Sequence, residues 1–307
     1  MVKEIYVITG ATGNIGKRIA EQLLQRGKKV RVIGREQNRL KSLVEQGAEA
    51  LVGSLEDSAF LTKAFQDAKA VFAMIPPNLT AKDLRAFQNR VSEALVNAIK
   101  ATGVTHIVTL SSLGAHVDSG SGPILGLHDS EKQFNQLNNV NVVHLRPSFF
   151  MENLLNGIPT IKNLAINGTP IDANIAIPMI ATKDIAERAV ALLETLSFTG
   201  KSSQELLGAK DLTLTEATRA LGEAIGKPDL KYVQFTYEDS KKVMLGLGLS
   251  ASVVDAMLEM YEGINNGLLT PTESRSPKNT TPTTIAEFAN EIFAPAFRSD
   301  QASHTAR

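Results

Sequence analysis

The sequence contains no cysteine and no tryptophan, and only 4 of its 307 residues are tyrosine. Without cysteine the chain has no disulfide, no thiol nucleophile and no thiolate ligand for a metal. Metal-ligand spacing is also missing among the five histidines, which are His106, His116, His128, His144 and His304. We therefore expect no metal site.

Charge of one sign is not in excess, because Lys and Arg total 32 and Asp and Glu also total 32. This balance gives no indication of nucleic acid or of an anionic membrane surface as a partner. No apolar run approaches the ~18 residues of a membrane-spanning helix, and no signal segment precedes the first apolar run. We expect a cytoplasmic protein that binds neither nucleic acid nor a membrane.

The most informative segment lies near the N-terminus, where an apolar run ends in three glycines and an amphipathic helix pattern follows at once. Glycine lets the backbone turn tightly and approach a pyrophosphate, and the helix N-terminus offers free N–H groups and a positive dipole. The context of a strand before and a helix after makes this a strong dinucleotide-binding signal, with an ordinary glycine-rich strand–helix turn as the alternative. We expect the loop residues to bind the cofactor: Gly10, Thr12, Gly13, Asn14, Ile15 and Gly16.

Strand and helix patterns alternate through the first half of the chain. After the first strand, further strand patterns lie at residues 30–33, 49–52, 70–75, 106–110 and 142–145. This alternation predicts parallel strands with right-handed crossovers, which form a doubly wound α/β sheet. We expect Asp57 to cap one of the intervening helices. Because ligands bind beyond the carboxyl ends of such strands, one edge should carry Gly10, Arg35, Ser54, Pro76, Ser111 and Pro147.

The second half of the chain has a different rhythm. Residues 156–178 are richer in Asn, Gly and Pro, and later patterns predict a helix led by Thr182, a strand at 205–208 and a helix at 215–226 capped by Thr215. Residues 270–284 read as an irregular connection. We expect a dinucleotide-binding domain at 1–153, a smaller α/β lobe at 154–297 packed over the strand ends, and a flexible tail at 298–307.

The residue after the second strand distinguishes the two nicotinamide cofactors. A carboxylate there accepts hydrogen bonds from a free ribose, whereas an arginine suits a 2′-phosphate. Arg35 occupies this place, with Asn38, Arg39 and Lys41 nearby, which favours NADP(H) over NAD(H). The preference reverses if the adjacent Glu36 points inward, and a solvated loop position is the other alternative for Arg35.

Several segments together resemble the NmrA-like branch of the atypical short-chain dehydrogenase/reductases. These segments are residues 9–16, 34–35, 53–55, 75–77, 146–153, 178–186 and 281–288, which span nearly the whole chain. The resemblance implies a Rossmann domain that binds NADP(H) and a small C-terminal lobe that closes a cleft. It also implies an interleaved boundary, with the helix of about residues 182–196 returning to the large domain. Many members carry an acidic residue where this chain has Ser54, so we expect an adenine contact through a hydroxyl and backbone.

Further cofactor contacts are expected along the strand ends, at Leu55, Met74, Ile75, Pro76, Ser111, Lys132, Pro147 and Phe149. Phe149, Phe150 and Met151 are expected to wall the nicotinamide pocket, with apolar packing beneath the cleft as the alternative for two of the three. We expect Phe150 and Asn153 to contact the substrate. Ser111 and Ser112 are expected to hydrogen-bond cofactor or loop backbone.

Typical short-chain dehydrogenases use a serine with Tyr-x-x-x-Lys, in which the spacing puts both side chains on one helix face. Here the matching pair is His128 and Lys132, so lysine is kept and histidine replaces tyrosine. An imidazole with its ordinary pKa of about 6.5 can donate a proton to a developing quinol oxygen. We expect His128 and Lys132 to be catalytic. The alternatives are that His128 caps the helix or faces solvent, and that Lys132 binds ribose or lies on the surface.

The leading interpretation is an NADPH-dependent oxidoreductase that transfers hydride to a quinone or a similar small conjugated carbonyl. Quinone reduction needs little beyond positioning, because the cofactor supplies the difficult chemistry. The alternative is a non-catalytic NADP(H)-binding redox sensor with a regulatory protein partner. A nucleotide-sugar epimerase or dehydratase is disfavoured because it relies on the missing tyrosine. The sequence leaves a homo-oligomer open.

Overall fold

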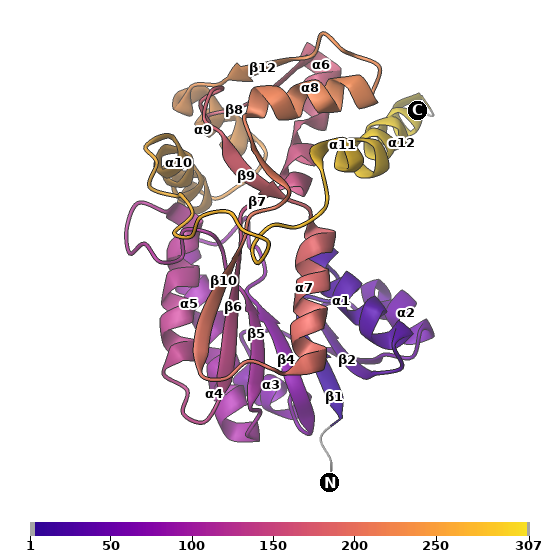
Figure 1. Cartoon of the computed structure of the whole chain (residues 1–307), viewed down its shortest axis with the longest axis vertical. Helices are drawn as coiled ribbons and strands as arrows, with labels where there is room; N and C mark the ends of the chain where they lie inside the picture. The colour runs from indigo at the N-terminus through magenta and orange to yellow at the C-terminus, as the bar shows by residue number, and fades with distance from the viewer. Residues whose placement is uncertain (1–3, 306–307) are drawn as a thin grey trace.

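A seven-stranded parallel sheet forms the larger part of the protein, in a computed structural model that describes residues 4–305. Its strands run in the order β10-β6-β5-β4-β1-β2-β3, and every neighbouring pair is parallel. The bounds are β1 Ile5–Ile8, β2 Lys29–Gly34, β3 Glu49–Val52, β4 Ala68–Met74, β5 His106–Leu110, β6 Asn141–Pro147 and β10 Lys201–Leu206. The predicted doubly wound α/β sheet is confirmed (Figure 1).

Helices cover both faces of this sheet, which explains why its central strands are mostly apolar. One face packs against α1 (Asn14–Gln25), α2 (Gln37–Glu45) and α7 (Thr182–Thr195). The other packs against α3 (Ser58–Ala64), α4 (Leu84–Thr102) and α5 (Leu125–Asn135). The strand order reverses between β1 and β4, so the carboxyl ends of these two strands form the crevice in which such sheets bind ligands.

Two helix starts compare directly with the sequence. Asp57 caps α3 as predicted, because its carboxylate accepts hydrogen bonds from the N–H groups of Ala59 and Phe60 at 2.9 and 3.0 Å. The predicted cap at Thr215 is wrong. Helix α8 (Leu214–Ala224) is capped by Thr213, two residues earlier. Glu216 completes a capping box with Thr213, and this reciprocal pair satisfies two amide groups where Thr215 satisfies none.

The smaller lobe lies above the strand ends in Figure 1. It contains a three-stranded sheet of β7 (Phe149–Phe150), β9 (Ile177–Ile180) and β11 (Lys210–Leu212), and a parallel pair of β8 (Ile166–Thr169) and β12 (Lys231–Gln234). Around these strands lie α6 (Ile158–Leu164), α8, α9 (Tyr237–Gly246), α10 (Ala251–Asn265), α11 (Ile285–Phe288) and α12 (Ala294–Thr305). Residues 298–305 thus continue a helix, and the last two residues lie outside the described part.

The two parts of the chain are interleaved. Helix α7 packs against α1, and β10, which the expected boundaries place in the smaller lobe, pairs with β6 at the edge of the large sheet. Residues 270–284 then run as an irregular strap fixed by buried carboxylates. Glu205 accepts hydrogen bonds from the Thr272 N–H and hydroxyl, and Asp184 accepts the same two from Thr283.

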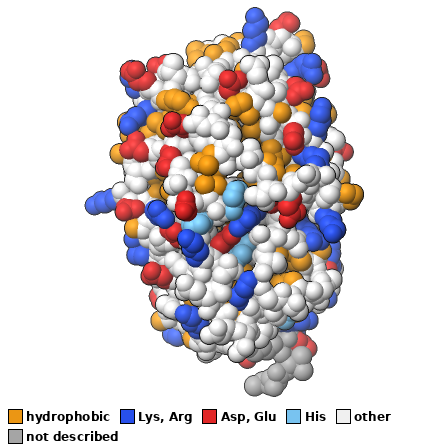
Figure 2. All heavy atoms as spheres, turned by 60° about the vertical axis from the view of Figure 1, so that its left-hand side comes forward, with side chains coloured by type: hydrophobic (Ala, Val, Ile, Leu, Met, Phe, Trp, Pro, Cys, Tyr) orange, Lys and Arg blue, Asp and Glu red, His pale blue; other side chains and the backbone are white. Residues whose placement is uncertain are grey.

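On the face seen in Figure 2, charged side chains of both signs are interspersed and apolar side chains gather mainly in the upper half. None of the helices within residues 4–305 is long and apolar enough to cross a membrane. The described residues also contain no cluster of His, Asp and Glu that could hold a metal ion.

Candidate functional site

The glycine loop between β1 and α1 lies at the crevice between β1 and β4. Gly10 has a φ of +64°, and an added Cβ would lie 2.6 Å from the Met74 sulfur. A Cβ at Gly16 would clash with the Gly10 carbonyl. Packing therefore requires glycine at both positions.

Gly13 differs from the other two glycines of the loop. Its φ is −97°, and a Cβ there would meet only the Gly10 carbonyl oxygen, at 3.4 Å. The protein itself therefore leaves room for a side chain at Gly13, whose surface is exposed. A space left open beside exposed loop backbone fits a ligand that approaches this backbone closely, as a diphosphate does.

The N-terminus of α1 is electrostatically free for an anion. Gly13 occupies the cap position without a side-chain hydrogen bond, and the first turn contains no acidic residue. The first N–H groups of the helix and the positive end of its dipole are therefore uncompensated by the chain. Together with the open Gly13, this arrangement fits the diphosphate of a dinucleotide.

Two arginines follow β2 beside this loop. Arg35 is exposed directly after the strand, and Arg39 on α2 donates a hydrogen bond to the Thr12 carbonyl at 3.3 Å. Glu36 is exposed and lies 3.8 Å from the Arg39 guanidinium, so its charge is opposed locally. The two residues expected to contact the cofactor after β3, Ser54 and Leu55, differ in exposure. Ser54 is exposed and accepts a hydrogen bond from the Glu56 N–H, whereas Leu55 is buried.

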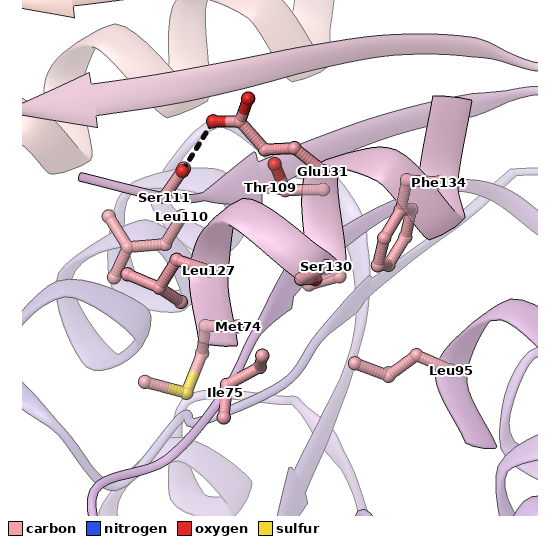
Figure 3. Close-up of a pocket in the computed structure, with 11 residues that line it drawn as sticks. Met74, Ile75, Leu95, Thr109, Leu110, Ser111, Leu127, Ser130, Glu131 and Phe134 are labelled. Carbon is pink, nitrogen blue, oxygen red and sulfur yellow. Dashed lines mark hydrogen bonds between the residues drawn. The ribbon is translucent and has the colours of Figure 1, made fainter. Parts of the chain in front are cut away.

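The pair of α5 side chains that faces the strand ends is not the predicted pair, His128 and Lys132. Leu127 and Glu131, also four residues apart, line a narrow cleft beyond β4 and β5, which we call the inner cleft (Figure 3). His128 and Lys132 are each one residue further along, and neither lines it. The inner cleft is lined by Ala73, Met74, Ile75, Leu95, Thr109, Leu110, Ser111, Leu127, Ser130, Glu131 and Phe134.

Glu131 forms a hydrogen-bonded polar cluster with Ser111 and Arg146. The Ser111 hydroxyl donates to Glu131 Oε1 at 2.5 Å, and Arg146 donates to both carboxylate oxygens at 2.9 and 2.5 Å. This bidentate contact raises the pKa of the Arg146 guanidinium above its ordinary value. The Ser111 proton is therefore committed to the carboxylate, so the serine oxygen faces any further partner as an acceptor.

His128 is buried, and one of its ring nitrogens is hydrogen-bonded to the backbone. Its Nδ1 lies 2.8 Å from the Ala115 carbonyl oxygen, and because a carbonyl only accepts, Nδ1 carries the proton. Its Nε2 is buried and has no partner among the described residues. Lys132 is exposed on the helix. The structure thus does not bring this predicted pair together with the inner cleft.

A larger pocket of about 260 Å³ lies next to the inner cleft, between the strand ends and the smaller lobe. We call it the outer pocket. One of its lining residues is Ser112, which directly follows Ser111 of the inner cleft in sequence. The lining also includes three predicted site residues, Phe149, Phe150 and Asn153. The other lining residues are Leu113, Ile124, Ser148, Ile177, Pro178, Met260, Ile264 and Leu269.

Sequence reasoning missed Glu131, Arg146 and the pocket wall from α10. A weak signal was present for the first, since Glu131 is an acidic residue on the apolar face of its helix, one turn before Phe134. The partner on β6 is 15 residues away in sequence, and the contribution of α10 is more than a hundred residues away. The periodicity of a single helix or strand does not indicate contacts between residues so far apart in sequence.

This geometry defines an α/β protein of the Rossmann type with a dinucleotide loop and an adjoining pocket. The model of the NmrA-like family matches residues 1–289, so the chain belongs to the NmrA-like family, and the predicted resemblance is confirmed.

The chain is similar to several named proteins. It is 28% identical over 257 residues to the NAD(P)H azoreductase of Xenophilus azovorans, covering 83% of this chain and 85% of that one. Its fold matches an NADPH-dependent quinone oxidoreductase from Escherichia coli, solved with NADPH, with a TM-score of 0.79, 23% identity and coverage of 94% and 99%. It also matches the triphenylmethane reductase of Citrobacter sp., solved with NADP(H), with a TM-score of 0.74, 20% identity and coverage of 94% and 99%.

Proposed function

We propose that this protein is an NADPH-dependent oxidoreductase that reduces a quinone or a similar small conjugated carbonyl compound. The observation that carries the proposal is the path of neighbouring residues that leads from the glycine loop, past the inner cleft, to the outer pocket. Met74 contacts Gly10 at one end of this path and lines the inner cleft with Ser111, and Ser112 opens the outer pocket. A dinucleotide held by its diphosphate at the loop would extend along this path to an acceptor in the pocket.

The phosphate-binding groups favour NADPH over NADH. Arg35 and Arg39 flank the loop, and both are exposed and able to contact a 2′-phosphate. The guanidinium geometry suits bidentate binding of phosphate, whereas the Glu36 carboxylate that would favour a free ribose is opposed by Arg39. The name of the NADPH-dependent quinone oxidoreductase with a similar fold agrees with this choice.

The cofactor supplies the hydride, and the reaction balances as NADPH plus quinone plus a proton giving NADP⁺ plus hydroquinone. The chain holds the reactants in place and excludes water. Phe149, Phe150 and Met260 surround the acceptor with apolar surface. Glu131 and Arg146 fix Ser111 as an acceptor for a donor group of the cofactor's nicotinamide half. We assign the proton to solvent rather than to His128, because His128 lines neither the inner cleft nor the outer pocket.

The test is steady-state oxidation of NADPH with a panel of quinones, azo compounds and enones. We expect turnover with quinones, formation of one hydroquinone per NADPH oxidised, and a lower KM for NADPH than for NADH. Titration of NADPH into the protein without acceptor serves as the control for cofactor binding.

One observation favours the non-catalytic sensor as a second candidate. Neither His128 nor Lys132 lines the inner cleft or the outer pocket, so no predicted acid reaches the acceptor. Tight binding of NADPH without turnover of any acceptor would support the sensor and refute the reductase. Loss of binding as well would refute both.

A further inference from the structure

We propose that the outer pocket selects an uncharged acceptor of one or two rings, and that the Ser148 hydroxyl donates a hydrogen bond to the acceptor's oxygen. This inference rests on the proposed reductase function and specifies which acceptors the site takes. It assigns a specificity role to Ser148, to Met260 and to the absence of charge around them.

The lining of the outer pocket excludes ionised ligands. None of the described residues that line it is Asp, Glu, His, Lys or Arg. A carboxylate or sulfonate moved into this pocket would lose its hydration and gain no counter-ion. A neutral ring system instead gains contact with two aromatic rings, Phe149 and Phe150, and with the polarisable thioether of Met260.

The size of the pocket limits the acceptor further. Its volume of about 260 Å³ falls below the range of roughly 300–1,000 Å³ that pockets for drug-sized ligands occupy. One or two fused rings fill such a space, whereas larger multi-ring dyes do not enter it completely. Helix α10 sets this limit, because Met260 and Ile264 project from it into the lining.

Ser148 is the hydroxyl in this pocket that remains free to donate. The Ser112 hydroxyl already donates to the Leu113 carbonyl at 2.9 Å. Ser148 is 5% exposed, and its hydroxyl oxygen is buried without a hydrogen-bond partner among the described residues. Its N–H donates to the Leu206 carbonyl at 2.9 Å, which fixes the backbone, and Ser148 lines the pocket, so the proposed hydrogen bond requires only that the hydroxyl turn about χ1. A quinone oxygen would satisfy this otherwise unpaired buried group.

A matched pair of acceptors tests the charge selectivity, namely 1,4-naphthoquinone and its 2-sulfonate. We expect the neutral quinone to have a KM at least about tenfold lower, and to bind at least about tenfold more tightly to the cofactor-free protein in calorimetry. Met260→Lys keeps an unbranched side chain, one atom longer, and adds a cation, so it should reduce or invert the preference for the neutral quinone. Leu247→Lys is the matched control, because Leu247 is 74% exposed and outside the pocket, and it should leave the preference unchanged.

A second pair of variants tests the hydrogen bond. Ser148→Ala should raise the KM for 1,4-naphthoquinone by about three- to tenfold, the value of one neutral hydrogen bond, with NADPH affinity unchanged. Ser148→Thr keeps the hydroxyl and should stay closer to the parent than the alanine variant does. Circular dichroism confirms that each variant is folded.

The outcomes separate this inference from the function on which it rests. Equal binding of the sulfonated and neutral quinones, or a Ser148→Ala variant indistinguishable from the parent, overturns the inference even if NADPH-dependent turnover persists. Absence of turnover with all acceptors overturns the proposed function, while the calorimetric comparison still decides whether the pocket selects neutral rings.

Discussion

Replacement of Glu131 tests the buried hydrogen-bonded cluster that it forms with Ser111 and Arg146. Its side chain is 8% exposed and that of Arg146 is 14% exposed. Glu131→Gln removes the charge and keeps the size. Breaking a buried ion pair on one side costs about 3–5 kcal/mol, because the other charge stays buried without its partner. Glu205 also faces Arg146 across the strand pair, so we expect a loss near the lower end, about 3 kcal/mol.

Two further variants test whether the loss of stability comes from an unpaired buried charge. Glu131→Leu combined with Arg146→Met removes both charges, so we expect this double variant to be more stable than Glu131→Gln alone. Glu49→Gln is the matched control. Glu49 also accepts a hydrogen bond from an arginine, Arg31, at 2.9 Å, but its side chain is 53% exposed. Its loss should cost at most about 1 kcal/mol.

Urea unfolding followed by circular dichroism measures the free energy of unfolding of each variant. The reasoning is refuted if Glu131→Gln and Glu49→Gln lose the same free energy. It is also refuted if the double variant is less stable than Glu131→Gln, because the cost would then come from lost contacts and not from an unpaired charge.

Three other predictions follow from the structure. Gly13→Ala should change the free energy of unfolding by less than about 0.5 kcal/mol yet weaken NADPH binding, whereas Gly16→Ala, which clashes with Gly10, should cost about 1–3 kcal/mol in urea unfolding. Arg35→Glu should weaken NADPH binding about tenfold or more in calorimetry without weakening NADH; equal loss for both would contradict a 2′-phosphate contact. Burial lowers the pKa of His144 from 6.5 to about 4, so the unfolded state takes up its proton first as the pH falls. The contribution of His144 to the free energy of unfolding should be fully present above about pH 6.5 and should fall by about 3 kcal/mol towards pH 4. The His144→Gln variant should lack most of this pH dependence.

The glycine loop and the sheet were predictable because their causes are local. The conformation at Gly10 and the close contact at Gly16 arise within one turn of chain, and the alternation of strands and helices reflects burial on both faces. The cap at Asp57 has the same character, since its two hydrogen-bond donors lie two and three residues further on. Interactions between residues that are close in sequence can therefore be predicted from the sequence pattern.

The side of α5 that faces the site was not predictable in this way. The sequence offered two pairs with the same spacing, His128 with Lys132 and Leu127 with Glu131, and they differ by one residue, or about 100° around the helix. The choice between them depends on what the helix packs against. Ser130 contacts Ser92 on α4 and Glu131 contacts Arg146 on β6, and these two contacts fix the rotation of the helix.

The outer pocket depends on glycines whose role appears only after folding. Gly122 has a φ of +56°, and a Cβ there would clash with the Ala256 carbonyl on α10, while a Cβ at Gly114 would lie 2.7 Å from Leu269. These glycines let α10 and the segment after it approach the loop that follows β5. The same approach carries Met260 and Leu269 to the pocket wall. The loop glycines of the large domain therefore set the width of a pocket whose outer wall belongs to the smaller lobe, which is why neither segment alone indicated the pocket.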